Sequence, residues 1–203
     1  MKTLSQISPY QNTIRKPVHC NGVGLHSGKQ INMTLNPAEA NTGIRFVRSD
    51  LDGKNYIPAF MNRVVDTTMA TTISEDNVSI ATTEHLLAAI NGLSIDNILI
   101  DVDGPEVPIM DGSSSPFVDL LLEAGSKQQK SYRRLVKITK EISFRDGDRD
   151  ISIYPYDGFK VTAEINFDHN SIKRQVYSVS VSEQKFIKEI SKARTFGLLE
   201  DVE

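Results

Sequence analysis

Residues 82–92 read TTEHLLAAING, and this stretch differs in character from the sequence before it. The run from Leu86 to Ile90 consists of good helix formers, so it predicts a helix over Thr83–Asn91. Thr82 or Thr83 can cap its start, because a threonine side chain can satisfy one of the unpaired amides there. Gly92 suits its end, since glycine readily adopts the left-handed conformation that closes helices.

Short alternating runs surround this helix and predict strands. Before it, Gln30–Leu35 and Gly43–Val47 alternate apolar and polar residues between turns. After it, Asn97–Asp103 alternates again, and a second helix is expected from its cap at Ser115 to a stop at Gly125. Strands combined with two helices predict an α+β domain over residues 1–126.

The sequence after this domain predicts a linker and a second domain. Residues 127–131, KQQKS, are all polar and predict the linker. Alternating runs over residues 135–144, 150–156 and 159–167 are separated by two Asp-Gly turns, which favour a meander. A third helix is expected to start near Ser182. We expect this second α+β domain, residues 132–203, to be incomplete, because one helix would leave much of its sheet uncovered.

The balance of charged residues narrows the range of molecules that the protein could bind. The 203 residues carry 23 Lys+Arg against 26 Asp+Glu, a net charge of -3. This balance argues against nucleic-acid binding, which needs a clustered basic surface.

A single cysteine, Cys20, excludes an intrachain disulfide. Neither a secretory signal nor an apolar run of about 20 residues occurs, so we expect a cytoplasmic protein. A lipid-bearing substrate could bring it into transient contact with a membrane surface. We also expect a monomer.

Glu84 and His85 place a carboxylate and an imidazole in the first turn of the predicted helix. Adjacent helical residues diverge by about 100°, so both side chains could reach one pocket. The positive end of the helix dipole favours an ionised Glu84 that is available as a base. The pair alone fits an exposed acid beside a surface histidine at least as well. His19, His26 and His169 complete no recognisable metal-ligand spacing.

Five motifs occur in order along the chain. They are GVGLHSG (22–28), TTEHLLAA (82–89), IDN (95–97), PEVPIMDGS (105–113) and ARTFG (193–197). Together they resemble the UDP-3-O-acyl-N-acetylglucosamine deacetylase family of lipid A biosynthesis. The resemblance implies two similar β-α-α-β domains with helices packed between two sheets. It also implies zinc-dependent hydrolysis of the N-acetyl group of UDP-3-O-(3-hydroxyacyl)-N-acetylglucosamine, with release of acetate.

The resemblance assigns three residues to the reaction. His85 matches a zinc ligand, and Glu84 matches the general base that takes a proton from the attacking water. Thr195 matches the hydroxyl that helps to stabilise the oxyanion of the tetrahedral intermediate. Such a donor can lower the barrier by roughly 3–4 kcal/mol.

The resemblance assigns four further residues to substrate binding. Phe167 matches an aromatic residue that stacks on the uracil, and Phe196 matches one that packs against the sugar. Arg149 stands where the family often has a lysine that meets the nucleotide phosphates. His26 could face the pocket, and a structural role in its glycine-rich loop fits equally well. Residues 198, 199 and 202 could begin a passage for the acyl chain or belong to an ordinary core.

The family pattern continues to a His-Lys-x-x-x-Asp segment that holds two more zinc ligands, and to a further histidine. The 203 residues contain neither. We therefore expect this chain to be a truncated form that does not hold zinc tightly and is inactive alone. The alternative is a non-catalytic fragment that binds a nucleotide sugar. An RNA-binding role is disfavoured by the acidic charge balance.

Overall fold

The computed structural model describes residues 8–53 and 55–197. Contacts between residues divide this part of the chain into two units. The larger unit holds residues 10–131 and 183–197, and the smaller unit holds residues 8–9 and 132–182. Strands occur in both, and the described helices belong to the larger unit, so the predicted α+β class is confirmed.

A five-stranded sheet organises the larger unit, in the order β2-β3-β9-β4-β5. Its strands are β2 (Val18–Val23), β3 (Gln30–Pro37), β4 (Ile44–Arg48), β5 (Tyr56–Pro58) and β9 (Ile98–Val102). The pairing is antiparallel except between β4 and β9, which run parallel. The three runs that predicted strands before and after the first helix are therefore adjacent in one sheet.

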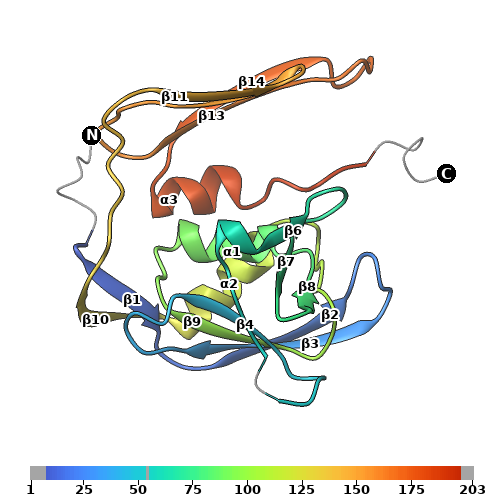
Figure 1. Ribbon diagram of the computed structural model, residues 1–203, viewed down its shortest axis with the longest axis vertical. Coiled ribbons are helices and arrows are strands. Elements are labelled where there is room, and N and C mark those ends of the chain that lie inside the picture. Colours follow the sequence, from blue (N-terminus) through green and yellow to red (C-terminus); the bar gives the residue numbers. More distant parts are fainter. Residues whose placement is uncertain (1–7, 54, 198–203) are drawn as a thin grey trace. The chain divides into compact units, whose positions relative to one another are not determined.

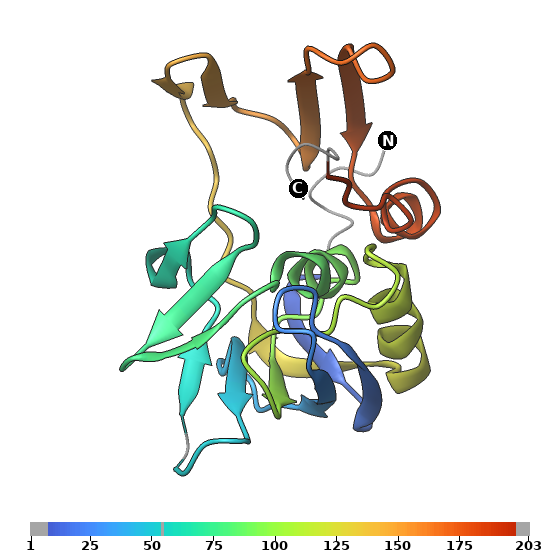
Figure 2. The same ribbon diagram turned by 90° about the vertical axis from the view of Figure 1, so that its right-hand side faces the viewer.

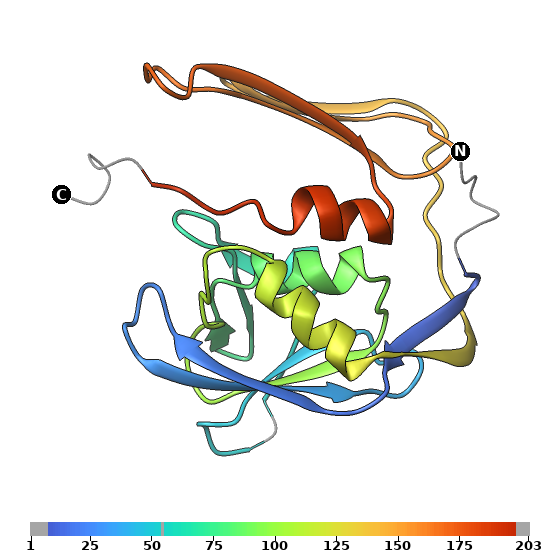
Figure 3. The same cartoon turned by 180° about the vertical axis from the view of Figure 1, so that it is seen from behind.

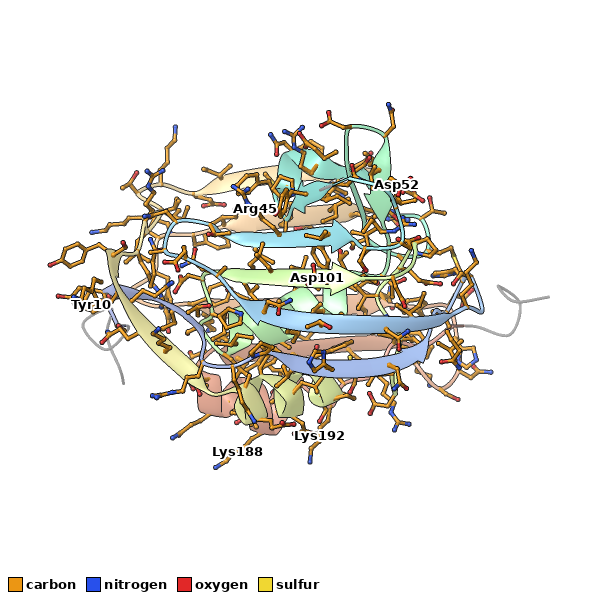
Figure 4. All side chains as sticks on the ribbon, turned by 90° about the horizontal axis from the view of Figure 1, so that it is seen from below. Tyr10, Arg45, Asp52, Asp101, Lys188 and Lys192 are labelled. Carbon is orange, nitrogen blue, oxygen red and sulfur yellow. The ribbon has the colours of Figure 1, made fainter. Side chains whose placement is uncertain are left out.

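The two faces of this sheet differ as the alternating sequence requires. On β3, Ile31, Met33 and Leu35 are buried, while the residues between them are more exposed. The helices α1 (Glu84–Gly92) and α2 (Ser115–Ala124) lie on the apolar face (Figures 1 and 3). Asp101 and Arg45 lie on neighbouring strands, and their side chains are on the opposite face of the sheet (Figure 4). The core therefore lies between the sheet and the two helices.

Both helices occur where they were predicted, but their first turns differ from expectation. Neither threonine before α1 caps it, because the Thr83 hydroxyl donates to the Thr71 carbonyl and the Thr82 hydroxyl donates to Glu106. The cap position of α2 is Ser114, one residue earlier than predicted, and its side chain makes no capping bond. Gly125 ends α2 with a φ of 69°, as expected for glycine.

The predicted linker is a strand. Residues Ser126–Tyr132 form β10, which pairs with β1 (Tyr10–Ile14) in a two-stranded sheet. The polar composition concealed it, because this strand has no apolar face, and its pairing uses backbone groups instead. Gln129 of β10 also donates to the Ala38 carbonyl at 2.8 Å. The segment thus belongs to the larger unit.

Asn97, from the IDN motif, joins four segments through a buried side chain. Its Oδ1 accepts from the Gly43 N–H at 2.8 Å, and its Nδ2 donates to Gln11 at 2.8 Å and to Gln129 at 2.7 Å. Replacing Asn97 with alanine removes these three hydrogen bonds, including the one that satisfies the Gly43 N–H, and should lower the free energy of unfolding by about 2–3 kcal/mol. Urea unfolding measures this loss. Asn55→Ala, in an exposed turn, is the control, and equal stabilities of the two variants would contradict the prediction.

A small sheet leads the chain into α1. It contains β6 (Val64–Asp66), β7 (Thr72–Glu75) and β8 (Val78–Ile80), preceded by the short helix η2 (Met61–Arg63). Asp76 and Asn77 both have positive φ, which suits the tight turn between β7 and β8. Because β8 ends only three residues before α1, this sheet fixes where the helix begins.

The third helix begins close to its predicted position but changes type. It starts as α3 (Glu183–Lys185) and continues as the π-helix η3 (Phe186–Ile190). Phe186 is buried against Gly92 at the end of α1, where any side chain would meet the phenyl ring. Glycine thus permits a close approach of η3 to α1. In the described part of the chain, no helix has the length and apolar character needed to cross a bilayer.

The smaller unit contains two hairpins rather than one meander. They are formed by β11 (Ile142–Asp146) with β12 (Arg149–Ile153), and by β13 (Lys160–Asn166) with β14 (Arg174–Ser180), as Figure 2 shows. The turn at Asp146-Gly147 is confirmed. A hairpin turn at Asp157-Gly158 is wrong, because β13 pairs with β14 and not with β12. Residues 135–141 are not a strand.

Cys20 lies on β2 and packs partly against the core. Burial raises the pKa of its thiol from 9.0 to about 11. Because the thiolate is the reactive form, alkylation by iodoacetamide at pH 8 should be about a hundredfold slower in the folded chain than in urea. Mass spectrometry of the labelled protein follows both rates. Equal rates in the two states would show that the thiol is not shielded.

Candidate active site

The carboxylate of Glu84 is held by the segment that leads into β7. Glu84 is the first residue of α1 and is half-buried. Its Oε2 accepts a hydrogen bond of 3.0 Å from the Thr71 backbone N–H. The Thr83 hydroxyl donates to the Thr71 carbonyl at 3.1 Å, so both backbone groups of Thr71 are tied to the helix start. One carboxylate oxygen is thereby fixed, and Oε1 remains to bind another group.

His85 follows directly and has a nitrogen atom without a partner. Its Nδ1 is shielded from solvent and makes no hydrogen bond within the described residues. Leaving such an atom unpaired costs roughly 1–3 kcal/mol, so the nitrogen suits a ligand from outside these residues. Neutral imidazole is a common zinc ligand. The described residues contain no group of three or more His, Cys, Asp or Glu placed to hold a metal, so His85 fits zinc as one ligand of a set.

His26 lies at an exposed position in the loop between β2 and β3. The loop closes on itself, because the Gly24 N–H donates to the Lys29 carbonyl at 2.9 Å and the Gly28 N–H donates to the Gly24 carbonyl at 3.0 Å. Gly28 has a φ of 64°, where a side chain would be strained. The glycines of the first motif therefore shape the turn that carries His26.

Glu106 connects this loop to the residues that precede α1. The side chain is buried, and its carboxylate accepts from the backbone N–H groups of Ser27 at 2.7 Å and His26 at 3.3 Å. It also accepts from the Thr82 hydroxyl at 3.1 Å. Burial raises the pKa of Glu106, but the hydrogen bonds from Ser27, His26 and Thr82 outweigh it, so the pKa lies below its usual value of 4.5. The carboxylate is therefore ionised at neutral pH.

Thr195 is attached to the PEVPIMDGS motif. Its backbone N–H donates to the Gly112 carbonyl at 2.9 Å, and its side chain is exposed. The preceding residue, Arg194, lies 3.7 Å from the Asp111 carboxylate. Asp111 and Gly112 form a turn, in which the Gly112 N–H donates to the Ile109 carbonyl at 3.0 Å and Gly112 has a φ of 80°. This turn also anchors the segment that carries Thr195.

The remaining predicted site residues are Phe196, Arg149 and Phe167. Phe196 follows Thr195 and is exposed. Arg149 begins β12 opposite Asp146, and Phe167 follows β13, where its N–H donates to the Lys173 carbonyl at 3.2 Å. Both belong to the smaller unit. Residues 198, 199 and 202, considered for an acyl passage, lie outside the described residues.

Two residues with contacts to the site were not predicted. Thr71 acts through its backbone, for which side-chain pattern gives no signal. Glu106 belongs to the fourth motif, but the two backbone N–H groups that it accepts from lie 79 and 80 residues earlier in the chain. The one signal in the sequence was an acidic residue in the short stretch from Pro105 to Pro108. If such a carboxylate is buried, it requires hydrogen-bond donors from elsewhere in the fold.

The chain matches a family of known enzymes. Residues 11–203 fit the model of the family described as LpxC: UDP-3-O-acyl N-acetylglycosamine deacetylase. The relative from Syntrophotalea carbinolica, named UDP-3-O-acyl-N-acetylglucosamine deacetylase, is 47% identical over 194 residues. Relatives of the same name from Histophilus somni and Shewanella halifaxensis are 46% and 47% identical.

These matches cover 95–96% of the chain but only 63–64% of each relative, so the chain spans a little under two thirds of their length. The family match, over residues 11–203, includes the segments that carry Glu84, His85 and Thr195. The chain belongs to the UDP-3-O-acyl N-acetylglycosamine deacetylase family.

Proposed function

We propose that this chain contributes a general base, one zinc ligand and an oxyanion donor to a deacetylase of lipid A biosynthesis. The reaction is hydrolysis of the N-acetyl group of UDP-3-O-(3-hydroxyacyl)-N-acetylglucosamine, which releases acetate. The proposal rests mainly on the arrangement of two side chains at the start of α1. There, a carboxylate held by one oxygen stands beside an imidazole whose buried Nδ1 has no hydrogen-bond partner among the described residues.

Glu84 is the base in this proposal. Hydrolysis of an amide requires removal of a proton from the attacking water, and a positioned carboxylate can contribute about 10²–10⁴-fold to the rate. The Thr71 N–H holds Oε2 and so restricts rotation of the carboxylate. Oε1 is the atom that accepts this proton.

His85 holds the metal. Zinc, when bound, lowers the pKa of a coordinated water and polarises a carbonyl oxygen. A catalytic zinc usually has three protein ligands, and this chain offers His85 as one of them. The two others expected from the resemblance belong to a segment that the 203 residues do not contain.

Thr195 and four further residues complete the proposal. The exposed Thr195 hydroxyl donates to the carbonyl oxygen as negative charge develops on it. Phe167 and Arg149 bind the uracil and the phosphates, Phe196 packs against the sugar, and His26 also contacts the substrate. A cytoplasmic location and a monomeric state remain predictions from the sequence.

The test is an assay of the complete gene product with the acylated UDP-sugar. Acetate release that stops on treatment with a chelator and resumes with Zn²⁺ is the expected result. Tight binding of the UDP-sugar without acetate release would instead favour a non-catalytic nucleotide-sugar-binding protein. Failure to bind or hydrolyse the UDP-sugar would contradict both assignments.

A further inference from the structure

We propose that Glu106 is a positioning residue that holds the loop carrying His26 against the start of α1. This inference rests on the proposed function for its catalytic consequence, but the contact itself is independent of that function. The carboxylate accepts hydrogen bonds from residues on both segments: Ser27 and His26 on one side, and Thr82 on the other. A single side chain thus joins two segments that each carry a predicted site residue.

The geometry around Glu106 shows that the fold is built to admit this carboxylate. A side chain at Gly24 would collide with Glu106 Oε1 and with the Ser27 hydroxyl. Glycine at position 24 is therefore required by the carboxylate and not by backbone conformation alone. The first and fourth motifs of the sequence, GVGLHSG and PEVPIMDGS, meet at this point.

The contact with Thr82 constrains the approach to α1. Thr82 has a φ of 57°, a left-handed conformation that is costly for a β-branched residue. Its hydroxyl donates to Glu106 Oε2, and backbone bonds on either side link Ala81 to Pro105 and Val107. Glu84 follows two residues later. Displacement of Glu106 therefore releases the strained residue that sets the position of Glu84 and His85.

The carboxylate accepts from three donors, the Ser27 and His26 N–H groups and the Thr82 hydroxyl, so an amide in its place would turn its own N–H group toward at least one of them. Glu106→Gln should speed hydrogen exchange of a peptide covering residues 24–29 by about tenfold or more, the effect of losing one charged hydrogen bond. Core peptides from β3 and β9 should keep their exchange rates. Mass spectrometry of the complete gene product measures both.

Asp103→Asn is the matched control. Asp103 also accepts a backbone N–H, from Asn32 at 2.6 Å, but it contacts β3 and not the loop. This variant should leave exchange over residues 24–29 unchanged. Gly24→Ala provides a second route, because it displaces the Glu106 carboxylate while leaving residue 106 intact, and it should reproduce the fast exchange. Normal exchange in both Glu106→Gln and Gly24→Ala would overturn the proposal.

A double-mutant cycle tests whether Glu106 acts on catalysis by positioning His26 or only by stabilising the fold. Glu106→Gln should lower kcat by about 10- to 100-fold, as expected for a small displacement of site residues. In a His26→Ala background the same change should lower kcat by a smaller factor, because the part of the effect that acts through His26 is already lost and only the part that acts through Thr82 remains. A full additional loss in that background would contradict positioning of His26. If no variant or wild type releases acetate while exchange responds as predicted, the proposed function fails and the attachment by Glu106 stands.

Discussion

Glu84→Gln should lower kcat of the complete gene product by about 10²–10⁴-fold, with zinc content and thermal stability unchanged. The amide keeps the shape of the side chain and can still accept the Thr71 N–H through its oxygen. It cannot accept a proton from water at neutral pH. The loss is therefore expected in kcat rather than in KM, because the substrate's binding contacts remain.

The control for this prediction is Glu123→Gln, the same chemical change at the exposed end of α2. Glu123 makes an exposed ion pair with Lys16, at 3.3 Å. Its replacement should leave kcat within about twofold, since exposed ion pairs contribute little. Wild-type kcat in Glu84→Gln would remove Glu84 from the reaction, whatever the control shows.

Phe46→Ala should lower the free energy of unfolding of the larger unit by about 3–5 kcal/mol, through lost burial and the cavity that remains. Phe46 is fully buried on β4, opposite Ile57 of β5 and Ile100 of β9. It therefore packs where the parallel and antiparallel halves of the sheet meet. Urea unfolding followed by circular dichroism measures the loss.

Phe60→Ala is the matched control for the core prediction. Phe60 is 60% exposed, so the same truncation there removes little buried surface. Its effect should stay below about 1 kcal/mol, as for most surface substitutions. Similar losses at positions 46 and 60 would mean that the core is not centred on this sheet.

The sequence predicted those elements whose side chains alternate in a clear pattern. Strand β3 has buried residues at every second position, and α1 begins one residue from its predicted start. Pattern alone could not reveal the parallel pairing of β4 with β9, because β4 ends at Arg48, β9 begins at Ile98, and several other elements lie between them in the sequence. Strand β10 was missed because a polar strand paired through its backbone resembles a linker.

The smaller unit was predicted less well because its strands are not half-buried. Phe144, Ile151 and Tyr177 are all more than half exposed, so burial does not impose one register between neighbouring strands. The Asp-Gly pair at residues 157–158 predicted a hairpin from local turn preference, whereas the longer pairing of β13 with β14 decided the arrangement.

For the site, residue types in the motifs predicted Glu84 and His85, but not the groups that hold them. The Thr71 backbone, the Glu106 carboxylate and the Gly112 carbonyl come from separate parts of the sequence. Such contacts depend on the tertiary fold, and a motif read along the chain does not contain them. The family match adds the assignment of roles, and the structure adds the contacts.

Equilibrium zinc titration of the complete gene product tests the central claim most directly, with His85→Ala compared against His19→Ala. His19 is exposed on β2, where its Nδ1 lies 2.8 Å from the Thr34 hydroxyl, so it serves as a matched histidine outside the site. We predict one tightly bound zinc in the wild type and in His19→Ala, and affinity lower by about a hundredfold or more in His85→Ala. Unchanged zinc affinity in His85→Ala would contradict the account.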